Sequence, residues 1–246
     1  MARYGMVIDL DRCMGCRACM EACKIENNTP QGIFWMRVFR FEEGEYPDVR
    51  YRFLPRPCMH CDNPPCTKVC PTGARYKRED GLVATDWEKC IGTRYCHAAC
   101  PYGANYFNWK EPQKNYYLDW SAAPELASVT GGMVPPYKNP DLEVPYGKEG
   151  RRIAGGGHRL RVIEKCTFCV HRVEKGILPA CAANCPVAAI HFGDLDDPES
   201  EVAKLLRERN PLRLREEFGT SPKVYYLSKS GPPTAKSREI EKVGAR

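Results

Sequence analysis

Four cysteines within eleven residues constrain this chain more than any other feature of its sequence. They are Cys13, Cys16, Cys19 and Cys23, and their spacing is C-x2-C-x2-C-x3-C. Thiolates two residues apart can share one metal core only if that core is larger than a single ion, because zinc typically takes two separate C-x2-C pairs. The spacing is that of a cubane iron–sulfur cluster. It predicts a chain in which bound metal supplies much of the folding energy.

The cysteine content supports metal binding over disulfide bonding. The chain has 15 cysteines in 246 residues, and they are bunched at spacings of two and three residues. Disulfides need a particular Cα separation and side-chain orientation, which such bunching satisfies poorly. The 21 prolines and 28% charged residues indicate a loop-rich fold with a small apolar core.

Charge and hydropathy bear on the partners of the chain. The formal net charge is +6 with thiols counted as neutral, and we assign much of this excess to offsetting cluster-bound thiolates rather than to nucleic-acid binding. No apolar run reaches the length of a membrane-spanning helix. The first residues contain neither a secretory signal nor a twin-arginine pair. We therefore expect the chain to reach a membrane or the periplasm only through a partner.

Three further cysteine groups follow the first. The second is Cys58-x2-Cys61-x4-Cys66-x3-Cys70, the third is Cys90-x2-Thr93-x2-Cys96-x3-Cys100, and the fourth is Cys166-x2-Cys169-x11-Cys181-x3-Cys185. Each of the three ends in Cys-Pro-x-x-Ala, the end of the bacterial ferredoxin motif, whose last cysteine binds the neighbouring cluster. The sequence thus predicts an α+β fold with two bacterial-ferredoxin-like modules and four iron–sulfur sites.

A shift of 77 residues aligns the first group with the third and exposes one missing cysteine. Cys13 then matches Cys90 and Cys23 matches Cys100, but Cys16 falls on Thr93. A threonine hydroxyl is a poor iron ligand compared with thiolate. The site could hold a three-iron cluster without that corner, a four-iron cluster with water, hydroxide or a partner's side chain there, or nothing. The three-iron cluster is the interpretation we favour.

The remaining segments suggest domain boundaries. We expect residues 1–57 and 158–195 to form one module, residues 58–110 an inserted second module, residues 111–157 a loop insertion, and residues 196–246 an irregular C-terminal extension with a mobile tail. The insertion is either a surface loop or an arm laid across a partner subunit. Within this frame we expect strands at residues 6–9, 82–86 and 224–227, a hairpin beginning near residues 33–41, and a short helix after residue 197.

Other residues that could take part in binding are explained as well by structural or surface roles. Histidines beside cysteine groups are more often supporting or surface residues than ligands; these are His60, His97, His171 and His191. Three basic residues of the fourth group could face an anionic pterin or a partner, although a solvated charged face is the simpler interpretation; these are Lys165, Arg172 and Lys175. The tryptophans are expected to pack around clusters or at interfaces; these are Trp35, Trp87, Trp109 and Trp120.

These cysteine groups, their Cys-Pro-x-Gly-Ala segments and the late stretch 193–198 resemble the electron-transfer iron–sulfur subunits of the molybdopterin oxidoreductase family. That family includes the partners of dimethyl sulfoxide, polysulfide, tetrathionate and arsenate reductases. The resemblance covers most of residues 4–227. The stretch from Cys90 to Cys96 is similar to the alternative complex III iron–sulfur subunit, where the cysteine is also replaced. The nitrate reductase electron-transfer subunit likewise replaces one cysteine of this group and carries a three-iron cluster.

The resemblance implies which cysteines share a cluster. Cluster 1 takes Cys13, Cys16, Cys19 and Cys185; cluster 2 takes Cys58, Cys61, Cys66 and Cys100; cluster 3 takes Cys70, Cys90 and Cys96, with Thr93 at its open corner; and cluster 4 takes Cys23, Cys166, Cys169 and Cys181. The implied cofactors are three [4Fe–4S] clusters and one [3Fe–4S] cluster. Sequence spacing alone does not determine this pairing.

The resemblance also implies a function in anaerobic respiration. The chain would carry electrons between a quinol-handling membrane anchor subunit and a molybdopterin catalytic subunit, without binding substrate or nucleic acid itself. Two departures from the pattern are Lys24, where the other groups have proline, and the lack of a C-terminal transmembrane helix, which implies a separate anchor. Co-export with the catalytic subunit would place the complex at the periplasmic face, with the cytoplasmic face as the alternative.

Two other classes of function stay open from the sequence. A multi-cluster ferredoxin of a hydrogenase or formate system would share the cysteine spacing, but the long insertion and the C-terminal segment disfavour it. A zinc-based nucleic-acid-binding module would show C-x2-C pairs without a third nearby cysteine. We find no nucleophile–base pair, phosphate loop or nucleotide fingerprint with supporting context, so the chain is not expected to be an enzyme by itself.

Overall fold

The computed structural model describes residues 2–112, 125, 128, 139–142, 144–147, 151–155, 157–231, 233 and 238–239. Trp120 and most of the glycine- and proline-rich insertion lie outside the described residues. The strands are β1 (Tyr4–Asp9), β2 (Arg37–Glu43), β3 (Arg50–Arg56), β4 (Arg75–Lys77), β5 (Val83–Thr85), β6 (Tyr106–Phe107), β7 (Pro145–Tyr146), β8 (Ala154–Gly155), β9 (Ile163–Glu164), β10 (Ile190–Asp194), β11 (Pro211–Leu212), β12 (Val224–Leu227) and β13 (Arg238–Glu239). The α-helices are α1 (Ala18–Glu26), α2 (Pro65–Lys68), α3 (Tyr95–Ala98), α5 (Val170–Val173), α6 (Ala180–Ala183) and α7 (Glu201–Glu208), and the 3-10 turns are η3 (Pro140–Leu142) and η4 (Glu216–Phe218).

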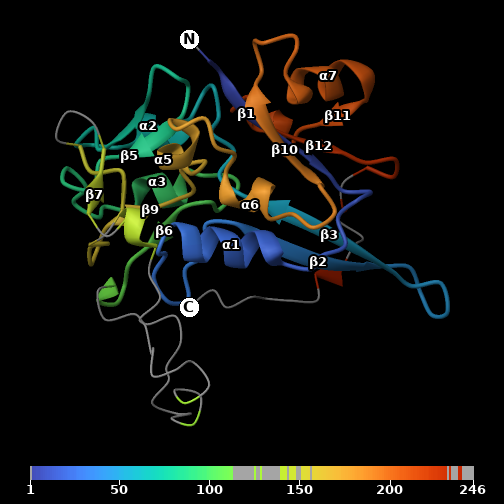
Figure 1. Cartoon of the computed structure of the whole chain (residues 1–246), viewed down its shortest axis with the longest axis horizontal. Helices are drawn as coiled ribbons and strands as arrows, with labels where there is room; N and C mark the ends of the chain where they lie inside the picture. Colours follow the sequence, from blue (N-terminus) through green and yellow to red (C-terminus); the bar gives the residue numbers. More distant parts are fainter. Residues whose placement is uncertain are drawn as a thin grey trace.

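The largest sheet joins the two ends of the chain. Its strand order is β10-β1-β12-β11, with β1 antiparallel to β10 and parallel to β12. Side chains of a strand alternate between its two faces, and β1 buries both. Met6 and Ile8 enter the main core, whereas Val7 packs with Val202 of α7 and Leu227 of β12. Figure 1 shows this sheet on the right, with α7 beyond it.

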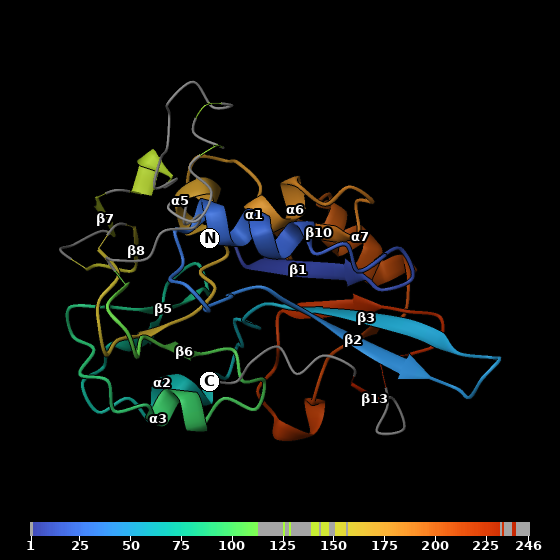
Figure 2. The same cartoon turned by 90° about the horizontal axis from the view of Figure 1, so that it is seen from below.

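A long hairpin and two neighbouring helices lie on opposite sides of β1. Strands β2 and β3 pair in register from Arg37↔Arg56 to Glu43↔Arg50. In Figure 2 the hairpin lies below β1 and extends away from the body, while α1 and α6 lie side by side above the strand. The expected hairpin is therefore present, although its first strand begins four residues later than Ile33.

The helices are short, and all of the described α-helices except α7 follow or contain part of a cysteine group. α2, α3 and α6 have four residues each and are followed within three residues by a Cys-Pro pair. Proline cannot donate a backbone N–H and disfavours helix in the residue before it. Lys24 replaces that proline in the first group, so α1 continues to nine residues. Its ammonium donates to the carbonyls of Thr29, Pro30 and Ile33 at 2.9–3.2 Å and closes the turn that follows.

One core serves both cysteine-rich regions. A single cluster of buried apolar residues includes Ile8 of β1, Trp35 before the hairpin, Trp87 after β5, Phe168 of the fourth group and Tyr226 of β12. Strand β6, which follows the third group, pairs with β9, which precedes the fourth. The two cysteine-rich regions therefore share one core.

The C-terminal extension is more regular than expected. Residues 201–227 contain α7, β11, η4 and β12, and β12 is a central strand of the largest sheet. Ser200 begins α7 by accepting a hydrogen bond from the Ala203 amide at 3.2 Å. Tyr226 and Lys223 are fully buried, and they donate to the carbonyls of Pro55 and Gly81 at 2.9 and 2.5 Å. The extension completes the fold of the cysteine-rich regions.

Parts of the insertion and tail also have regular structure. In the insertion, β7 pairs with β8, and η3 precedes them. In the tail, β13 pairs with β2 along the hairpin. These stretches are short, with two residues in each strand, and they lie within the segments expected to be a loop insertion and a tail. The expected strands at residues 6–9, 82–86 and 224–227 are confirmed as β1, β5 and β12, and the helix expected after residue 197 begins at Glu201.

Candidate iron–sulfur sites

The first cysteine group forms a tight loop before α1. Gly15 and Arg17 have φ values of +71° and +65°, a conformation in which glycine is at no disadvantage. A Cβ at Gly15 would also meet the ring of Phe53 at 2.3 Å. Burial raises the pKa of the Cys19 thiol to about 12, and the nearby charges of three cysteines add to the rise; these are Cys13, Cys185 and Cys16.

The last cysteine of this group lies in a different set. Cys23 is fully buried, and burial together with the charges of Cys169 and Cys166 raises its pKa. The pKa of Cys181 is raised in the same way, with Cys169, Cys23 and Cys166 as its charged neighbours. Helix α1 thus begins at one cysteine set and ends at another. The second of these sets combines Cys23 with cysteines more than 140 residues later.

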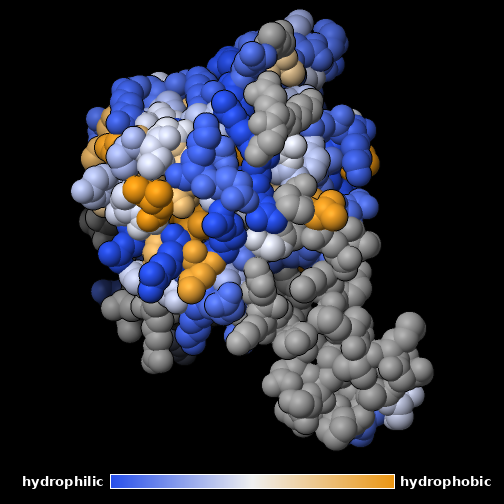
Figure 3. Space-filling view, turned by 90° about the vertical axis from the view of Figure 1, so that its left-hand side faces the viewer, coloured by the Kyte–Doolittle hydropathy of each residue, from blue (hydrophilic) through white to orange (hydrophobic). Residues whose placement is uncertain are grey.

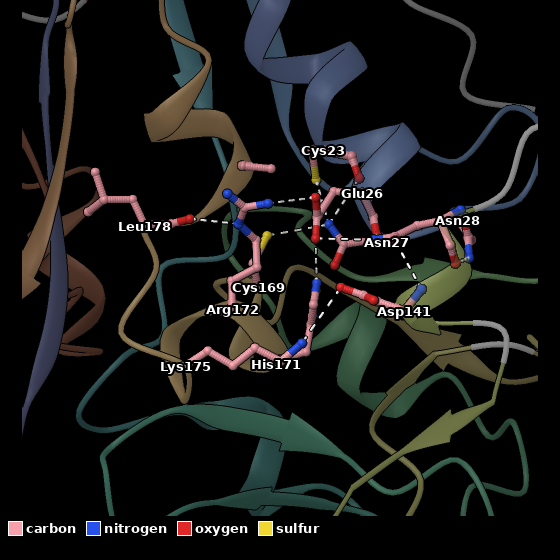
Figure 4. Close-up of polar contacts among 12 residues, drawn as sticks. Cys23, Glu26, Asn27, Asn28, Asp141, Cys169, His171, Arg172, Lys175 and Leu178 are labelled. Atoms are coloured by element: carbon pink, nitrogen blue, oxygen red, sulfur yellow. Dashed lines mark hydrogen bonds and ion pairs between the residues drawn. The ribbon is translucent and has the colours of Figure 1, made fainter.

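Polar side chains surround the set that contains Cys23 and Cys169. Asn27 is 1% exposed, and its Nδ2 lies 3.6 Å from the Cys23 sulfur and 3.5 Å from that of Cys169. Figure 4 shows this amide between the two cysteines, and Glu26 facing His171 and Arg172. The Glu26 carboxylate lies 2.7 Å from His171 Nε2 and 2.9 Å from Arg172 Nη1. These contacts attach the end of α1 to α5.

Four cysteines of the second and third groups enclose a cavity. Cys58, Cys61, Cys66 and Cys100 line an empty space of about 340 Å³ together with Val83. Burial raises the pKa of Cys61 to about 12 and that of Cys66 to about 11, and neighbouring thiols of the set contribute to both.

The remaining cysteines line a similar cavity that includes Thr93. Cys70, Cys90 and Cys96 border an empty space of about 310 Å³, and Thr93 lies at its edge. The loop around Thr93 has the backbone of the first loop, since Gly92 and Arg94 have φ values of +73° and +63°. A Cβ at Gly92 would meet the Arg161 carbonyl at 2.3 Å. The loop therefore has the conformation of the first loop although Thr93 replaces the second cysteine of the motif.

Backbone amides point at the cysteine sulfurs. His60 donates to Cys58, Arg75 to Cys70, Phe168 to Cys166 and Ala189 to Cys185, with N···S distances of 3.3–3.5 Å. Such bonds stabilise sulfur in its anionic form. Each amide lies two to five residues after its cysteine, so the turns that follow the cysteines supply the donors.

The residues present fit iron–sulfur clusters. Four sets of cysteines converge from distant parts of the chain, and thiols packed this closely repel one another once ionised unless a cationic core lies between them. Within the described residues, no group of three or more His, Cys, Asp or Glu side chains is suited to a single metal ion. In a multi-iron cluster each thiolate binds a different iron, so the sulfurs need not meet at one point.

Comparison with known proteins agrees with this chemistry. Two models of 4Fe-4S dicluster domains match the chain, one at residues 49–115 and 145–195 and the other at residues 12–74. The chain is 42% identical over 240 residues to the arsenate respiratory reductase iron-sulfur subunit of Shewanella sp. strain ANA-3, covering 95% of this chain and 99% of the relative. The chain belongs to the family of reductase iron–sulfur subunits.

Other members of this family are also similar. The putative dimethyl sulfoxide reductase iron-sulfur subunit of Halobacterium salinarum is 42% identical over 256 residues, covering 98% of this chain and 86% of the relative. A selenate reductase subunit of Mesobacillus selenatarsenatis is 46% identical over 223 residues, covering 91% and 71%. Membership confirms the resemblance seen in the sequence, and with it 4Fe-4S clusters, an electron-transfer role and a non-catalytic subunit of a reductase complex. No helix in the described part of the chain is long and apolar enough to span a membrane.

Among the described residues, the imidazoles of the histidines beside the cysteines contact oxygen atoms or a backbone amide rather than the cysteine sulfurs. His60 Nδ1 accepts from the Val83 amide at 3.0 Å. In the described structure the oxygen partners are the Cys166 carbonyl for His60, the Asn105 carbonyl for His97, Glu26 for His171 and Glu201 for His191, at 2.7–3.0 Å. Burial, together with the charges of Lys165 and Lys223, lowers the pKa of His60, so its imidazole is neutral. The contacts agree with a supporting role for these side chains.

The basic residues of the fourth group behave differently from one another. Lys165 is 3% exposed and donates to the carbonyls of Val83 and Cys166, so the expected solvated face is wrong for this residue. It joins β5 to the fourth group. Arg172 pairs with Glu26 and donates to the Leu178 carbonyl at 2.8 Å. Lys175 is exposed and lies 3.6 Å from Asp141, as a solvated residue would.

The tryptophans divide into buried and exposed ones. Trp35 and Trp87 are 1% exposed, and the imidazole of His158 lies at 6.2 and 5.0 Å from their rings. His158 also contacts the fully buried carboxylate of Glu164 at 2.8 Å, which sequence reasoning missed. Trp109 is exposed and packs beside the Arg94 guanidinium, one residue after Thr93.

Exposed apolar residues lie beside the third group. Ile91 is 68% exposed and Tyr95 is 61% exposed, on either side of Thr93. The side of the molecule that carries α2 and α3 shows small apolar patches within a largely hydrophilic surface (Figure 3). By the 77-residue repeat, Ile91 corresponds to Met14, which is 59% exposed beside the first group.

Proposed function

We propose that this chain carries electrons through four iron–sulfur clusters between a quinol-linked membrane subunit and a molybdopterin catalytic subunit. Membership of the reductase iron–sulfur family supports the electron-transfer role. The proposed ligands are Cys13, Cys16, Cys19 and Cys185 for cluster 1, Cys58, Cys61, Cys66 and Cys100 for cluster 2, Cys70, Cys90 and Cys96 for cluster 3, and Cys23, Cys166, Cys169 and Cys181 for cluster 4. The clusters supply one-electron chemistry when bound.

The structure supports this division through the way α1 spans two cysteine sets. Cys19 shares its surroundings with Cys185, whereas Cys23, one helical turn later, has Cys166 and Cys169 as neighbours. A single helix therefore sets the separation of clusters 1 and 4. The chain positions the clusters, shields them from water and donates hydrogen bonds to their ligands, and these are the levers through which a protein sets cluster potential.

Cluster 3 is proposed to be a [3Fe–4S] cluster. The single observation that carries this proposal is the loop from Cys90 to Cys96, which keeps the backbone of the Cys13–Cys19 loop while Thr93 replaces the second cysteine. The preserved loop favours a bound cluster over an empty site. A hydroxyl is a weak iron ligand beside three thiolates, which favours loss of the corner iron over a four-iron cluster with another ligand.

EPR spectroscopy of the anaerobically purified, oxidised protein tests the cluster type. A [3Fe–4S] cluster is paramagnetic when oxidised, so the wild type should show its signal, and Thr93→Cys should convert it to a [4Fe–4S] cluster that is silent in that state. Iron content should rise by one atom per chain. Thr93→Ser is the matched control, because it keeps a hydroxyl and should keep the wild-type signal. The absence of a three-iron signal from the wild type would refute the assignment.

The partners are proposed from the same reasoning. The relatives are named as subunits of reductases, which supports a catalytic partner. We propose a molybdopterin subunit as that partner and a separate quinol-handling subunit as the membrane anchor. Co-export with the catalytic subunit would place the chain at the periplasmic face. The exposed Ile91 and Tyr95 beside cluster 3 suit a protein contact at that end of the electron path.

A further inference from the structure

A buried arginine lies at the cavity formed by Cys70, Cys90 and Cys96. Arg75 is 2% exposed and projects from β4 directly opposite Thr85 of β5. Both side chains line the cavity formed by Cys70, Cys90 and Cys96. A guanidinium removed from water is strongly destabilising unless negative charge or hydrogen-bond acceptors compensate it.

The described partners of Arg75 are cysteine sulfurs. Its Nη2 donates to Cys96 at 3.4 Å and its backbone amide donates to Cys70 at 3.4 Å, so one residue contacts two of the three cysteines. Burial opposes the charge of Arg75, but the charges of Cys96, Cys66 and Cys58 outweigh it and raise the pKa of the guanidinium.

Other buried polar atoms at this cavity have no partner within the protein. Nε and Nη1 of Arg75 are buried without a hydrogen-bond partner in the described structure, and so is the hydroxyl of Thr85. Buried donors are rarely left unpaired in folded proteins. Three such atoms beside one cysteine-lined cavity indicate that the missing acceptors belong to the group that fills it.

We propose that Arg75, assisted by Thr85, donates hydrogen bonds to the sulfides of cluster 3 and raises its reduction potential. The inference rests on the proposed cluster at Cys70, Cys90 and Cys96, but holds for a three-iron or a four-iron cluster. Reduction adds negative charge, which a neighbouring buried cation stabilises. The potential of cluster 3 is therefore higher than it would be without Arg75. Cluster 2 is affected less, because Arg75 donates to Cys96 and Cys70 and lines the cluster 3 cavity.

The test is a potentiometric titration of the holoprotein followed by EPR, with the cluster 3 signal identified by its loss in Cys90→Ser. In Arg75→Gln, which removes the charge, the ratio of reduced to oxidised cluster 3 at a fixed solution potential should fall at least tenfold. This corresponds to a midpoint lower by 59 mV for one electron. Thr85→Val should give a smaller fall. Cluster 2 should shift in the same direction, by less than cluster 3.

Arg78→Gln is the matched control for general damage. Arg78 lies three residues after Arg75, outside the cavity, where it pairs with Asp80 and Glu174. This variant should leave the cluster 3 ratio within twofold of the wild type. An unchanged ratio in Arg75→Gln, or an equal fall in Arg78→Gln, would overturn the proposal.

Three further outcomes separate this inference from the proposed function. If Arg75→Gln loses the cluster, Arg75→Lys is the deciding variant, because it retains the charge. Retention of cluster 3 in Arg75→Lys with a smaller fall in the ratio supports the proposal. Loss of the cluster in Arg75→Lys to the same extent as in Arg75→Gln overturns it. If Thr93→Cys leaves the EPR spectrum unchanged, the three-iron assignment fails while the Arg75 ratio still decides this inference. A wild-type protein with no cluster on these cysteines overturns both.

Discussion

Replacing Asn27 by leucine should lower the reduction potential of cluster 4. The Asn27 amide is buried at the end of α1 and contacts the sulfurs of Cys23 and Cys169 at 3.6 and 3.5 Å, besides donating to the Cys23 carbonyl at 2.9 Å. Leucine has a similar size but no donor. Hydrogen bonds to sulfur strengthen as the cluster gains negative charge, so their removal disfavours the reduced state.

The two contacts set the size of this effect. A hydrogen bond to a charged group contributes about 1.5–3 kcal/mol, and these contacts are long and share one amide. If each strengthens by about 0.5 kcal/mol on reduction, the pair contributes about 1 kcal/mol, or about 40 mV for one electron. Asn27→Asp should produce a larger fall, because a carboxylate adds a negative charge where the amide donated.

A redox titration of cluster 4 in the holoprotein measures the shift. Asn28→Gly is the control, because Asn28 is the next residue and bonds to Asn139 rather than to sulfur. Its φ of +49° suits glycine. The reasoning is refuted if Asn27→Leu keeps the wild-type midpoint with its cluster intact, or if Asn28→Gly lowers the midpoint by as much.

Two further predictions concern segments that support the clusters. Tyr226→Phe removes the hydroxyl that donates to Pro55, so the free energy of unfolding of the holoprotein should fall by about 1–2 kcal/mol. Thermal bleaching of the clusters should begin at a lower temperature than in the wild type. Tyr225→Phe, which changes a neighbouring half-buried ring, is the control and should melt like the wild type. Lys24→Pro supplies the proline found in the other groups but interrupts α1 and removes the ammonium contacts, at a cost of about 3 kcal/mol or more. The helical circular dichroism signal and the iron content per chain should both fall, and wild-type values for both would contradict the role given to α1.

The local features of the fold were largely predictable because they depend on residues close together in sequence. The apolar residues 6–8 identified β1, the apolar run 224–227 identified β12, and the cysteine spacing located the loops. The 77-residue repeat also marked Thr93 as the altered corner, and the structure gives both loops the same backbone. Which cysteines share a cluster came from family resemblance, since spacing does not encode contacts between residues more than 100 positions apart.

Several residues around the sites could not be identified from sequence because their roles depend on tertiary contacts. Arg75 is one of 37 lysines and arginines, and only the pairing of β4 with β5 places it beside Thr85 at a cysteine-lined cavity. Lys165 looked like a surface residue because its sequence neighbours include charged ones, yet its ammonium is buried between backbone carbonyls. His158 and Glu164 form a buried pair that has no motif.

The position of β1 determines the order in which the chain can mature during synthesis. Its hydrogen-bonding neighbours are β10 and β12, which begin at Ile190 and Val224. Neither edge of β1 can therefore be covered until β10 and β12 have been made. By contrast, the cysteines that line the two central cavities are all made by residue 100. Because chains fold as they emerge, all the cysteines of the two central cavities exist before β1 has a partner strand, and closure of the largest sheet comes last.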